Sequence, residues 1–242
     1  MQEWLIKLHD DFVLNFVTED RWRLLLSGLQ KTAIITLLSG LLGLILGVII
    51  AMIRSTYDKT ADSARPTVGR KIFGFVDWFC RVYLTVIRGT PVVVQLMITY
   101  FVILASVRNG TLVAALAFGL NSGAYVAEIV RGGIMSIDNG QFEAGRSLGF
   151  NYLQTMRFIV IPQTVKNVLP SLANEMIALL KETSIAGYVA VQDLTKAGDV
   201  IRSRTYSPFL PLIAVALIYL VLVIFFTKLV GMLERRLRSS DH

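Results

Sequence analysis

The sequence is poor in the residues on which many catalytic and metal sites depend. Its 242 residues include one cysteine, Cys80, and two histidines, His9 and His242, close to opposite ends of the chain. A single cysteine excludes an internal disulfide. Without a cysteine and histidine cluster, the usual ligand pattern of a zinc site is also missing. We therefore expect no metal site in this chain.

Motifs for nucleotide binding and nucleophilic catalysis are missing as well. No GxxxxGK(S/T) phosphate loop occurs, so the chain is not expected to bind ATP in the P-loop manner. Ser184 lies in an apolar segment with no histidine base near it in the sequence. A packing or hydrogen-bonding role is therefore a better interpretation than a nucleophile. We expect no catalytic residue, and a membrane enzyme is the weaker alternative.

Charged residues make up only 17% of the chain, against 54% hydrophobic residues, and they lie mostly between long apolar blocks. A helix of about 20 apolar residues crosses a hydrocarbon core of about 30 Å. The pattern predicts an all-α polytopic membrane protein, with a transmembrane domain over residues 28–237. We expect five transmembrane helices, over residues 32–53, 82–105, 111–130, 165–190 and 208–227.

The segments between and beyond these spans have their own character. Residues 1–27 begin with an amphipathic stretch that we expect at the membrane interface, and residues 238–242 form a short tail. Residues 54–81 are predicted to be a polar loop, because Pro66 and Gly69 would break a continuous helix. Pro91 interrupts the second span and permits a bend there.

The positive charges indicate an orientation. The formal net charge is +7, and the basic residues flank the apolar spans, so lipid and topology explain them better than nucleic acid. Fourteen Lys and Arg residues fall on the side that holds the loop after the first span, the loop after the third and the tail, and eight fall on the other. This imbalance predicts an external N-terminus and a cytoplasmic C-terminus.

Residues 138–162 form a mixed polar stretch between two predicted spans, and two helix starts can be found in it. Asp138 with Gln141, and Asn151 with Gln154, have the spacing of capping boxes, while Gly149 suits a left-handed helix stop. We predict two short helices with a corner at Gly149 and Phe150, ended by Pro162. The apolar side chains at the corner are Phe142, Leu148 and Phe150. These side chains would either form an apolar projection that docks into a cleft on a soluble partner or belong to a surface loop that rests on the membrane.

The same stretch carries a family resemblance. Glu143, Ala144, Gly149, Ile159 and the Ile161-Pro162 pair, within EAGRSLGFNYLQTMRFIVIP, resemble the EAA loop of bacterial ATP-binding-cassette (ABC) importer permeases. Gly145 stands where a second Ala is common, and Ile161 where Leu is. Three further segments, YLTVIRGTPVVVQLMITYF, LNSGAYVAEIVRGGI and LLKETSIAG, resemble the polar amino acid permeases of the glutamine, histidine and arginine type.

The resemblance implies a type I importer permease fold in a bacterial cytoplasmic membrane, with 138–162 as the cytoplasmic coupling loop. It assigns ATPase coupling to Glu143, Ala144, Gly145, Leu148, Gly149 and Phe150. It also implies a separate ATPase that holds ATP and Mg, with no cofactor in this chain. The other expected partners are a second permease copy or a paralogue, an extracytoplasmic binding protein and an amino acid substrate.

Polar residues inside the predicted spans are candidates for the substrate path, since charged and amide groups at mid-membrane are costly unless they face protein or water. These candidates are Gln95, Asn121, Tyr125, Asn174, Glu175, Thr183 and Ser184. Structural or gating roles are predicted for Arg88, Pro91, Glu128, Arg131, Lys181 and Glu182. The alternative for several of them is interhelical pairing, as of Arg88 with Glu128 or Lys181 with Glu182.

The resulting hypothesis is a permease subunit of an importer for polar, possibly basic, amino acids. The main alternative is a secondary transporter driven by protons or sodium, in which Glu128 or Glu175 would titrate. A sensory or scaffold protein that kept the fold without transport is a further alternative. The secondary transporter leaves the EAA-like loop unexplained.

Overall fold

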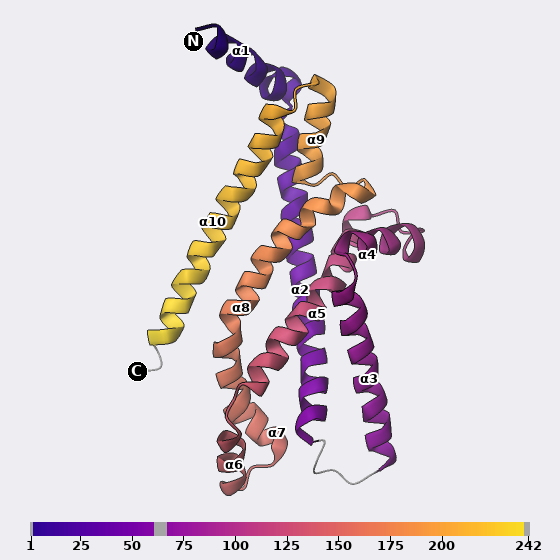
Figure 1. Ribbon diagram of the computed structural model, residues 1–242, viewed down its shortest axis with the longest axis vertical. Coiled ribbons are helices and arrows are strands. Elements are labelled where there is room, and N and C mark those ends of the chain that lie inside the picture. The colour runs from indigo at the N-terminus through magenta and orange to yellow at the C-terminus, as the bar shows by residue number, and fades with distance from the viewer. Residues whose placement is uncertain (1, 61–66, 240–242) are drawn as a thin grey trace. The chain divides into compact units, whose positions relative to one another are not determined.

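The computed structural model describes residues 2–60 and 67–239, and within these residues the chain is helical without a β-strand (Figure 1). The all-α prediction is confirmed for this part of the chain. The long helices are α2 (Trp22–Thr60), α3 (Val68–Gly89), α5 (Gly110–Met135), α8 (Ile161–Glu182) and α10 (Phe209–Ser239). The shorter ones are α1 (Gln2–Phe12), α4 (Val92–Ile98), α6 (Asn139–Ser147), α7 (Tyr152–Thr155) and α9 (Leu194–Thr205). Short π-helical turns are η1 (Val13–Val17), η3 (Thr99–Ile103) and η4 (Met156–Val160), and 3-10 turns are η2 (Thr18–Asp20) and η5 (Thr183–Val189).

Three stretches of the described chain are long and apolar enough to cross a membrane: Trp22–Lys59, Gly110–Met135 and Phe209–Arg236. They contain or overlap the first, third and fifth predicted spans. The second predicted span is broken into two helical pieces, Val68–Gly89 and Val92–Ile103, which together make a fourth candidate. Helix α8, with Lys166, Asn174 and Glu175, is not among these candidates. The count of five spans and the orientation therefore stay predictions.

The polar loop predicted over residues 54–81 is wrong for the described residues. Helix α2 runs on to Thr60, and α3 begins at Val68 after Thr67, whose side chain accepts a hydrogen bond from the amide of Arg70. Gly69 lies in the first turn of α3, where the helix tolerates it. Pro66 lies outside the described residues. The charged residues of this stretch that the structure describes instead lie on α2 and α3, where Arg54, Asp58, Asp77 and Arg81 form ion pairs.

Of two prolines predicted to interrupt helices, Pro91 does so and Pro162 does not. Pro162 does not end a helix. It is the second residue of α8, and the helical backbone reaches it without a break from η4, where the amide of Ile161 donates to the carbonyl of Met156. A π-helical turn therefore directly precedes this proline, which has no amide hydrogen of its own. Pro91 does interrupt the chain, because it separates α3 from α4, and Thr90 before it is extended with φ −123° and ψ 149°, as residues before proline prefer.

The chain divides into two compact units, and several long helices contribute to both. The first unit comprises Met1–Ser39, Val93–Phe118 and Ile177–Leu229. Its apolar core contains Phe16, Leu25, Leu194, Ala197, Ile201 and Val215. The fully buried Asn15 donates from Nδ2 to Ser207 Oγ at 3.2 Å and accepts from Thr205 Oγ1 at 2.8 Å. The N-terminal segment is thereby tied to the turn that follows α9.

Helix α9 begins at a buried cap in the first unit. The Asp193 carboxylate accepts hydrogen bonds from the amides of Thr195 and Lys196. Burial raises the pKa of Asp193 above its usual value, while these hydrogen bonds act in the opposite direction. The cap therefore combines a desolvation cost with the satisfaction of two helix amides.

The second unit comprises Gly40–Val92, Gly119–Met176 and Val230–His242. One of its apolar clusters contains Ala51, Val126, Val130, Ile134, Ile137, Met156 and Val160. A second contains Ile50, Cys80, Leu84, Ala124 and Ala127. Helices α2 and α5 approach closely, since a Cβ placed on Gly47 would lie 2.5 Å from Val126 Cγ1 and 2.9 Å from the backbone nitrogen of Ala127. Small residues permit such contacts between membrane helices.

This close approach makes Gly47→Ala a destabilising change. Since the new methyl group would meet both a side chain and the backbone, we expect a loss of about 1–3 kcal/mol, measured by thermal unfolding of the purified chain in detergent. Gly231→Ala is the matched control, because a Cβ at Gly231 in α10 meets nothing within 4 Å. An unchanged melting temperature for Gly47→Ala would contradict the close packing of α2 on α5.

Candidate functional site

The two helix starts predicted between residues 138 and 162 are both present. Asp138 caps α6, where its Oδ1 accepts from the amide of Gly140 at 2.6 Å. The predicted reciprocal bond from Gln141 is wrong, since the Gln141 Oε1 instead accepts from Gln163 Nε2 at 3.3 Å. At α7 the capping box is complete: Asn151 and Gln154 exchange two hydrogen bonds of 2.9 Å.

The corner at Gly149 is also confirmed, and its hydrogen bonds define its type. Gly149 has φ +81°, a left-handed conformation that glycine adopts without a steric cost. The amide of Phe150 donates to the carbonyl of Gly145 at 3.0 Å, and that of Gly149 to Arg146 at 2.9 Å. These are the two bonds of a Schellman motif, so α6 ends in a well-defined turn toward α7.

Gly145 has a packing role in this arrangement. It is buried, and a Cβ there would lie 2.6 Å from Thr155 Oγ1 and 2.8 Å from its Cγ2. Alanine is common at the matching position of the EAA loop. At Gly145 its methyl group would push α6 away from α7. The departure from the EAA pattern at Gly145 therefore has a physical reason: it lets α6 and α7 pack closely, at a helix-propensity cost of about 1 kcal/mol.

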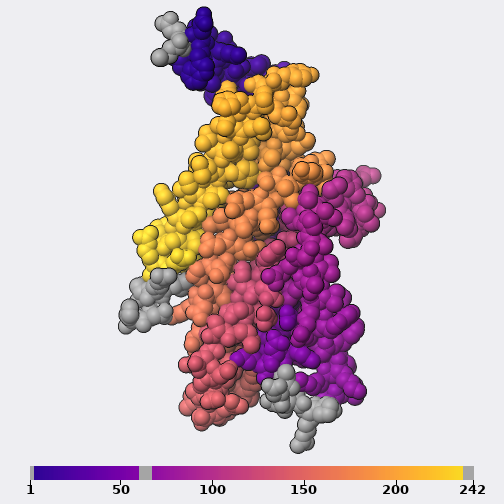
Figure 2. Space-filling model, in the orientation of Figure 1, coloured from indigo at the N-terminus to yellow at the C-terminus, as the bar shows by residue number. Residues whose placement is uncertain are grey.

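The apolar projection at the corner differs in part from the prediction. Leu148 is 71% exposed, as expected for a docking residue. Phe142 and Phe150 are half-buried: Phe142 stacks on Tyr152 and Phe150 lies against Phe158. Leu153 beside the corner is also exposed, at 75%, and the sequence analysis missed it. Figure 2 shows this pink segment at the molecular surface.

A cleft of about 470 Å³ lies beside the corner. It is lined by Lys59, Asn139, Phe142, Glu143, Arg146, Tyr152 and Thr155. Its walls therefore combine one stacked aromatic pair with two cationic side chains and one carboxylate. Glu143 and Ala144, the first two residues of the EAA-like motif, are exposed, as contact with a partner protein requires.

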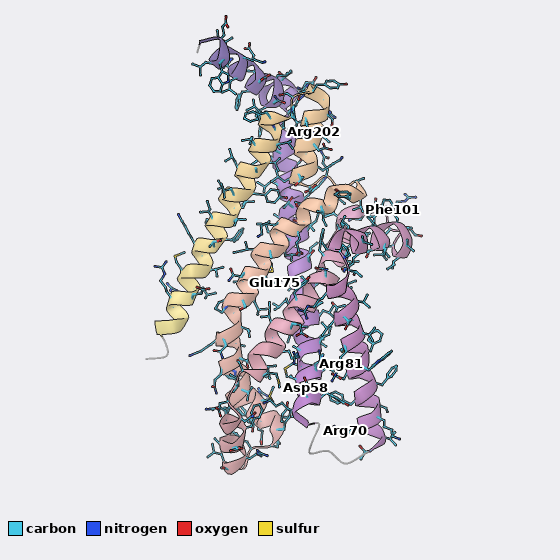
Figure 3. All side chains as sticks on the ribbon, in the orientation of Figure 1. Asp58, Arg70, Arg81, Phe101, Glu175 and Arg202 are labelled. Atoms are coloured by element: carbon cyan, nitrogen blue, oxygen red, sulfur yellow. The ribbon has the colours of Figure 1, made fainter. Side chains whose placement is uncertain are left out.

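A second cluster of polar residues in the same unit joins α2, α3 and α5 by ion pairs. Arg54 lies 3.5 Å from both Asp77 and Glu128. Arg81 pairs with Asp77 at 2.7 Å and with Asp58 at 3.6 Å, and Figure 3 labels Asp58 and Arg81. The predicted pairing of Arg88 with Glu128 is confirmed at 3.8 Å.

Arg131 completes this network, with 3.2 Å to Glu128 and 3.5 Å to Asp58. Asp77 is almost wholly buried, with 3% of its side chain exposed. The sequence analysis missed the roles of Arg54, Asp58, Asp77 and Arg81, because it placed them in a loop. One sequence feature could have indicated these ion pairs. Three acidic residues and four arginines lie near the ends of adjacent spans: Asp58, Asp77, Glu128, Arg54, Arg81, Arg88 and Arg131.

The candidates for the substrate path are distributed over both units. In the second unit, Asn121 is buried, Ser122 donates to Glu175 Oε1 at 3.1 Å, and the Arg88 guanidinium lies 5.8 Å from the Tyr125 ring centroid. Asn174 is exposed on α8. Figure 3 labels Glu175 on the same helix.

Gln95, Lys181, Glu182, Thr183 and Ser184 belong to the first unit. Thr183 is buried and donates to the carbonyl of Leu180 at 2.8 Å, Gln95, Glu182 and Ser184 are half-buried, and Lys181 is exposed. Within the fourth predicted span, α8 stops at Glu182 and the chain continues as the 3-10 turn η5. A substrate role for these residues stays a prediction.

A comparison with protein families decides the class. Residues 43–239 match the family described as binding-protein-dependent transport system inner membrane component. The chain belongs to this family. It is accordingly a permease component of a transport system and not an enzyme, in agreement with the ABC-importer hypothesis. The ion-coupled secondary transporter has no support from this membership.

Individual relatives are similar over most of their length. The arginine transport system permease protein ArtQ of Bacillus subtilis is 38% identical over 221 residues, which cover 90% of this chain and 94% of that protein. The putative glutamine transport system permease protein GlnP of Rickettsia bellii is 33% identical over 243 residues, 99% of this chain and 100% of that protein. A crystal structure of an amino acid ABC transporter with histidines matches with a TM-score of 0.78 and 38% identity, covering 91% of this chain and 98% of that one.

The turn at Gly149 predicts a strong effect of a β-branched side chain in this permease. Gly149→Val forces a residue that disfavours positive φ into the Schellman turn, at a cost of roughly 1–2 kcal/mol. We expect reduced ATP hydrolysis in response to substrate in the assembled transporter. Gly149→Asn, which tolerates the left-handed region, should retain more of this response. Equal activity of both variants and the parent would show that the turn is not needed for coupling.

The buried carboxylate of Asp77 predicts a second effect. Asp77→Asn removes the buried carboxylate that pairs with Arg54 and Arg81 and leaves Arg54 with Glu128 alone. Breaking a buried pair costs up to about 3–5 kcal/mol. We expect a lower unfolding midpoint in detergent for this variant. Asp10→Asn, at an exposed position of α1, is the control and should leave the midpoint unchanged. A wild-type midpoint for Asp77→Asn would show that the network does not stabilise the helices.

Proposed function

We propose that this chain is the permease subunit of an ABC importer for polar amino acids. The observation that carries the proposal is the corner between α6 and α7. A Schellman turn at Gly149, a complete capping box at Asn151 and the exposed side chains of Leu148 and Leu153 make a rigid apolar projection on a membrane protein of this family. A soluble ATPase that docks on this projection would transmit its motion to the spans.

The amino acid substrate is supported by the relatives and by the residues of the spans. The relatives are named for arginine and glutamine transport, and the similar crystal structure is that of an amino acid ABC transporter. An amino acid needs acceptors for its ammonium group and donors for its carboxylate. Within the second unit, Glu175 and Asn174 would supply acceptors for the ammonium group. The acids in these spans favour neutral polar or basic substrates.

The proposal includes a topology. It counts five spans, with α8 as the polar fourth one that faces the substrate path, and places the N-terminus outside and the C-terminus in the cytoplasm. The corner between α6 and α7 then faces the cytoplasm, where ATP is available. The protein would reside in the bacterial cytoplasmic membrane, consistent with a family of inner membrane components.

The proposal also includes partners. ATP and Mg would be held by a separate ATPase that docks at Glu143 and Leu148. A second permease copy, identical or paralogous, would complete the substrate path, and an extracytoplasmic binding protein would deliver the amino acid. Closure of the ATPases would draw the two coupling segments together and switch the spans from inward-open to outward-open.

The N-terminal segment fits the interfacial position proposed for residues 1–27. Trp4, Leu5 and Phe12 lie within a 100° arc of α1 when placed at 100° per residue, and all three are exposed, at 63%, 54% and 52%. Asn15 anchors the segment to the turn between α9 and α10. The chain then continues into α2, a helix with many exposed apolar side chains. An aromatic and aliphatic face at the end of a span is typical of helices that lie in the headgroup region.

The test of the proposed function is ATP hydrolysis by the assembled transporter in nanodiscs. The assembly would contain this chain, the ATPase and the binding protein encoded beside it, and hydrolysis would be measured with a panel of amino acids. We expect stimulation by one group, such as Arg, Lys and His, or Gln. An assembled complex that no amino acid stimulates would contradict the proposed substrate class. Uptake that stops with an uncoupler at constant ATP would contradict the ATP-driven mechanism.

A further inference from the structure

The last full turn of α2 carries two consecutive charged residues with different partners. Successive residues of a helix project about 100° apart, so Asp58 and Lys59 point toward different neighbours. Lys59 Nζ donates to Asn139 Oδ1 at 2.7 Å and lies 4.8 Å from the centroid of the Phe142 ring. A single ammonium group thus makes both a hydrogen bond and a cation–π contact with α6.

The two partners of Lys59 lie on one face of the coupling segment. Asn139 and Phe142 are three residues apart in the first turns of α6, so their side chains are neighbours. Phe142 in turn stacks on Tyr152 of α7, with ring centroids 6.4 Å apart and an interplanar angle of 15°. Through Phe142, the Lys59 side chain therefore reaches both helices of the corner.

Asp58 connects the same turn of α2 to two other membrane helices. Its carboxylate lies 3.6 Å from Arg81 of α3 and 3.5 Å from Arg131 of α5. Arg81 and Arg131 also bind Asp77 and Glu128, which belong to the ion-pair network. One turn of α2 thus contacts the coupling segment through Lys59 and the membrane helices through Asp58.

Chain connectivity shows why such a contact matters. The segment from α6 to α7 is joined by the backbone to α5 before it and to α8 after it. Helices α2 and α3 have no such direct link to it. The apolar cluster around Ala51 and Met156 joins α2 to the base of the segment, and Lys59 of α2 makes a polar contact with α6 itself.

We infer that Asp58 and Lys59 form a joint that transmits movement of the coupling segment to α2 and α3. The inference rests on the proposed function and adds positioning residues to it. Docking of the ATPase at the corner moves α6, Lys59 makes the end of α2 follow Asn139 and Phe142, and Asp58 carries the displacement to Arg81. Lys59 contacts neither substrate nor nucleotide in this mechanism.

The test compares three variants in the complete transporter in nanodiscs. Lys59→Gln removes the charge, Lys59→Arg keeps a cation and a donor, and Lys71→Gln changes an exposed lysine of α3. We expect Lys59→Gln to lower the amount of amino acid transported per ATP hydrolysed about fivefold, the size of effect that a cation–π contact and a hydrogen bond typically have. Lys59→Arg should restore most of this ratio, and Lys71→Gln should leave it unchanged.

A double variant separates transmission from a general loss of stability. If Lys59 acts through Asn139, then Lys59→Gln combined with Asn139→Ala should lower the ratio no further than Lys59→Gln alone. Additive losses would contradict a shared contact. Asp58→Asn should also lower the amount of amino acid transported per ATP hydrolysed while ATP hydrolysis continues. The change removes the ion pairs of Asp58 with Arg81 and Arg131, which form the other half of the joint.

A second readout does not depend on transport. Hydrogen exchange of the α6 amides, measured by mass spectrometry on the complex, should be faster in Lys59→Gln than in the parent or in Lys71→Gln. If the parent complex hydrolyses ATP but no amino acid stimulates it, the proposed function is wrong. Faster α6 exchange in Lys59→Gln would in that case still show that Lys59 holds α6. Unchanged transport per ATP and unchanged exchange in Lys59→Gln would overturn the joint.

Discussion

The pairing of buried charge within the membrane-associated part of the chain is the constraint on which the second unit depends. Asp77 is nearly inaccessible to solvent, and an isolated carboxylate in such a place would cost several kcal/mol. It is tolerated because Arg54 and Arg81 surround it, and these arginines extend to Glu128 and Asp58. Three helices are held in register by this network, and each helix must keep its position for the charges of the others to be compensated.

The coupling corner depends on that register. Its own shape is local, since the Schellman bonds to Gly145 and Arg146 and the capping box at Asn151 involve only residues close in sequence. Its position is not local, because Lys59 and the apolar cluster around Met156 place it against α2. A rigid turn attached to helices that are themselves tied by ion pairs is suited to transmit force, whereas a flexible loop would absorb it.

Much of the fold was predictable because it rests on short-range rules. Apolar blocks predicted the long helices α2, α5 and α10, and glycine with capping residues predicted the turn between α6 and α7. The errors have a common physical cause. Arg54, Asp58, Asp77 and Arg81 suggested a solvent-exposed loop, and only the approach of α2, α3 and α5 shows that they form ion pairs. Phe142 was predicted to project outward, but stacking on Tyr152 draws it inward.

The sequence by itself determined the class of protein, the main helices and the corner at Gly149, because hydrophobic length, capping spacing and the need for positive φ are encoded within a few residues. The tertiary structure decided which charges pair, why Gly145 has no room for a methyl group beside Thr155, and that Lys59 contacts α6. These contacts join residues up to 80 positions apart. They depend on the packing of helices against one another, which no local pattern specifies.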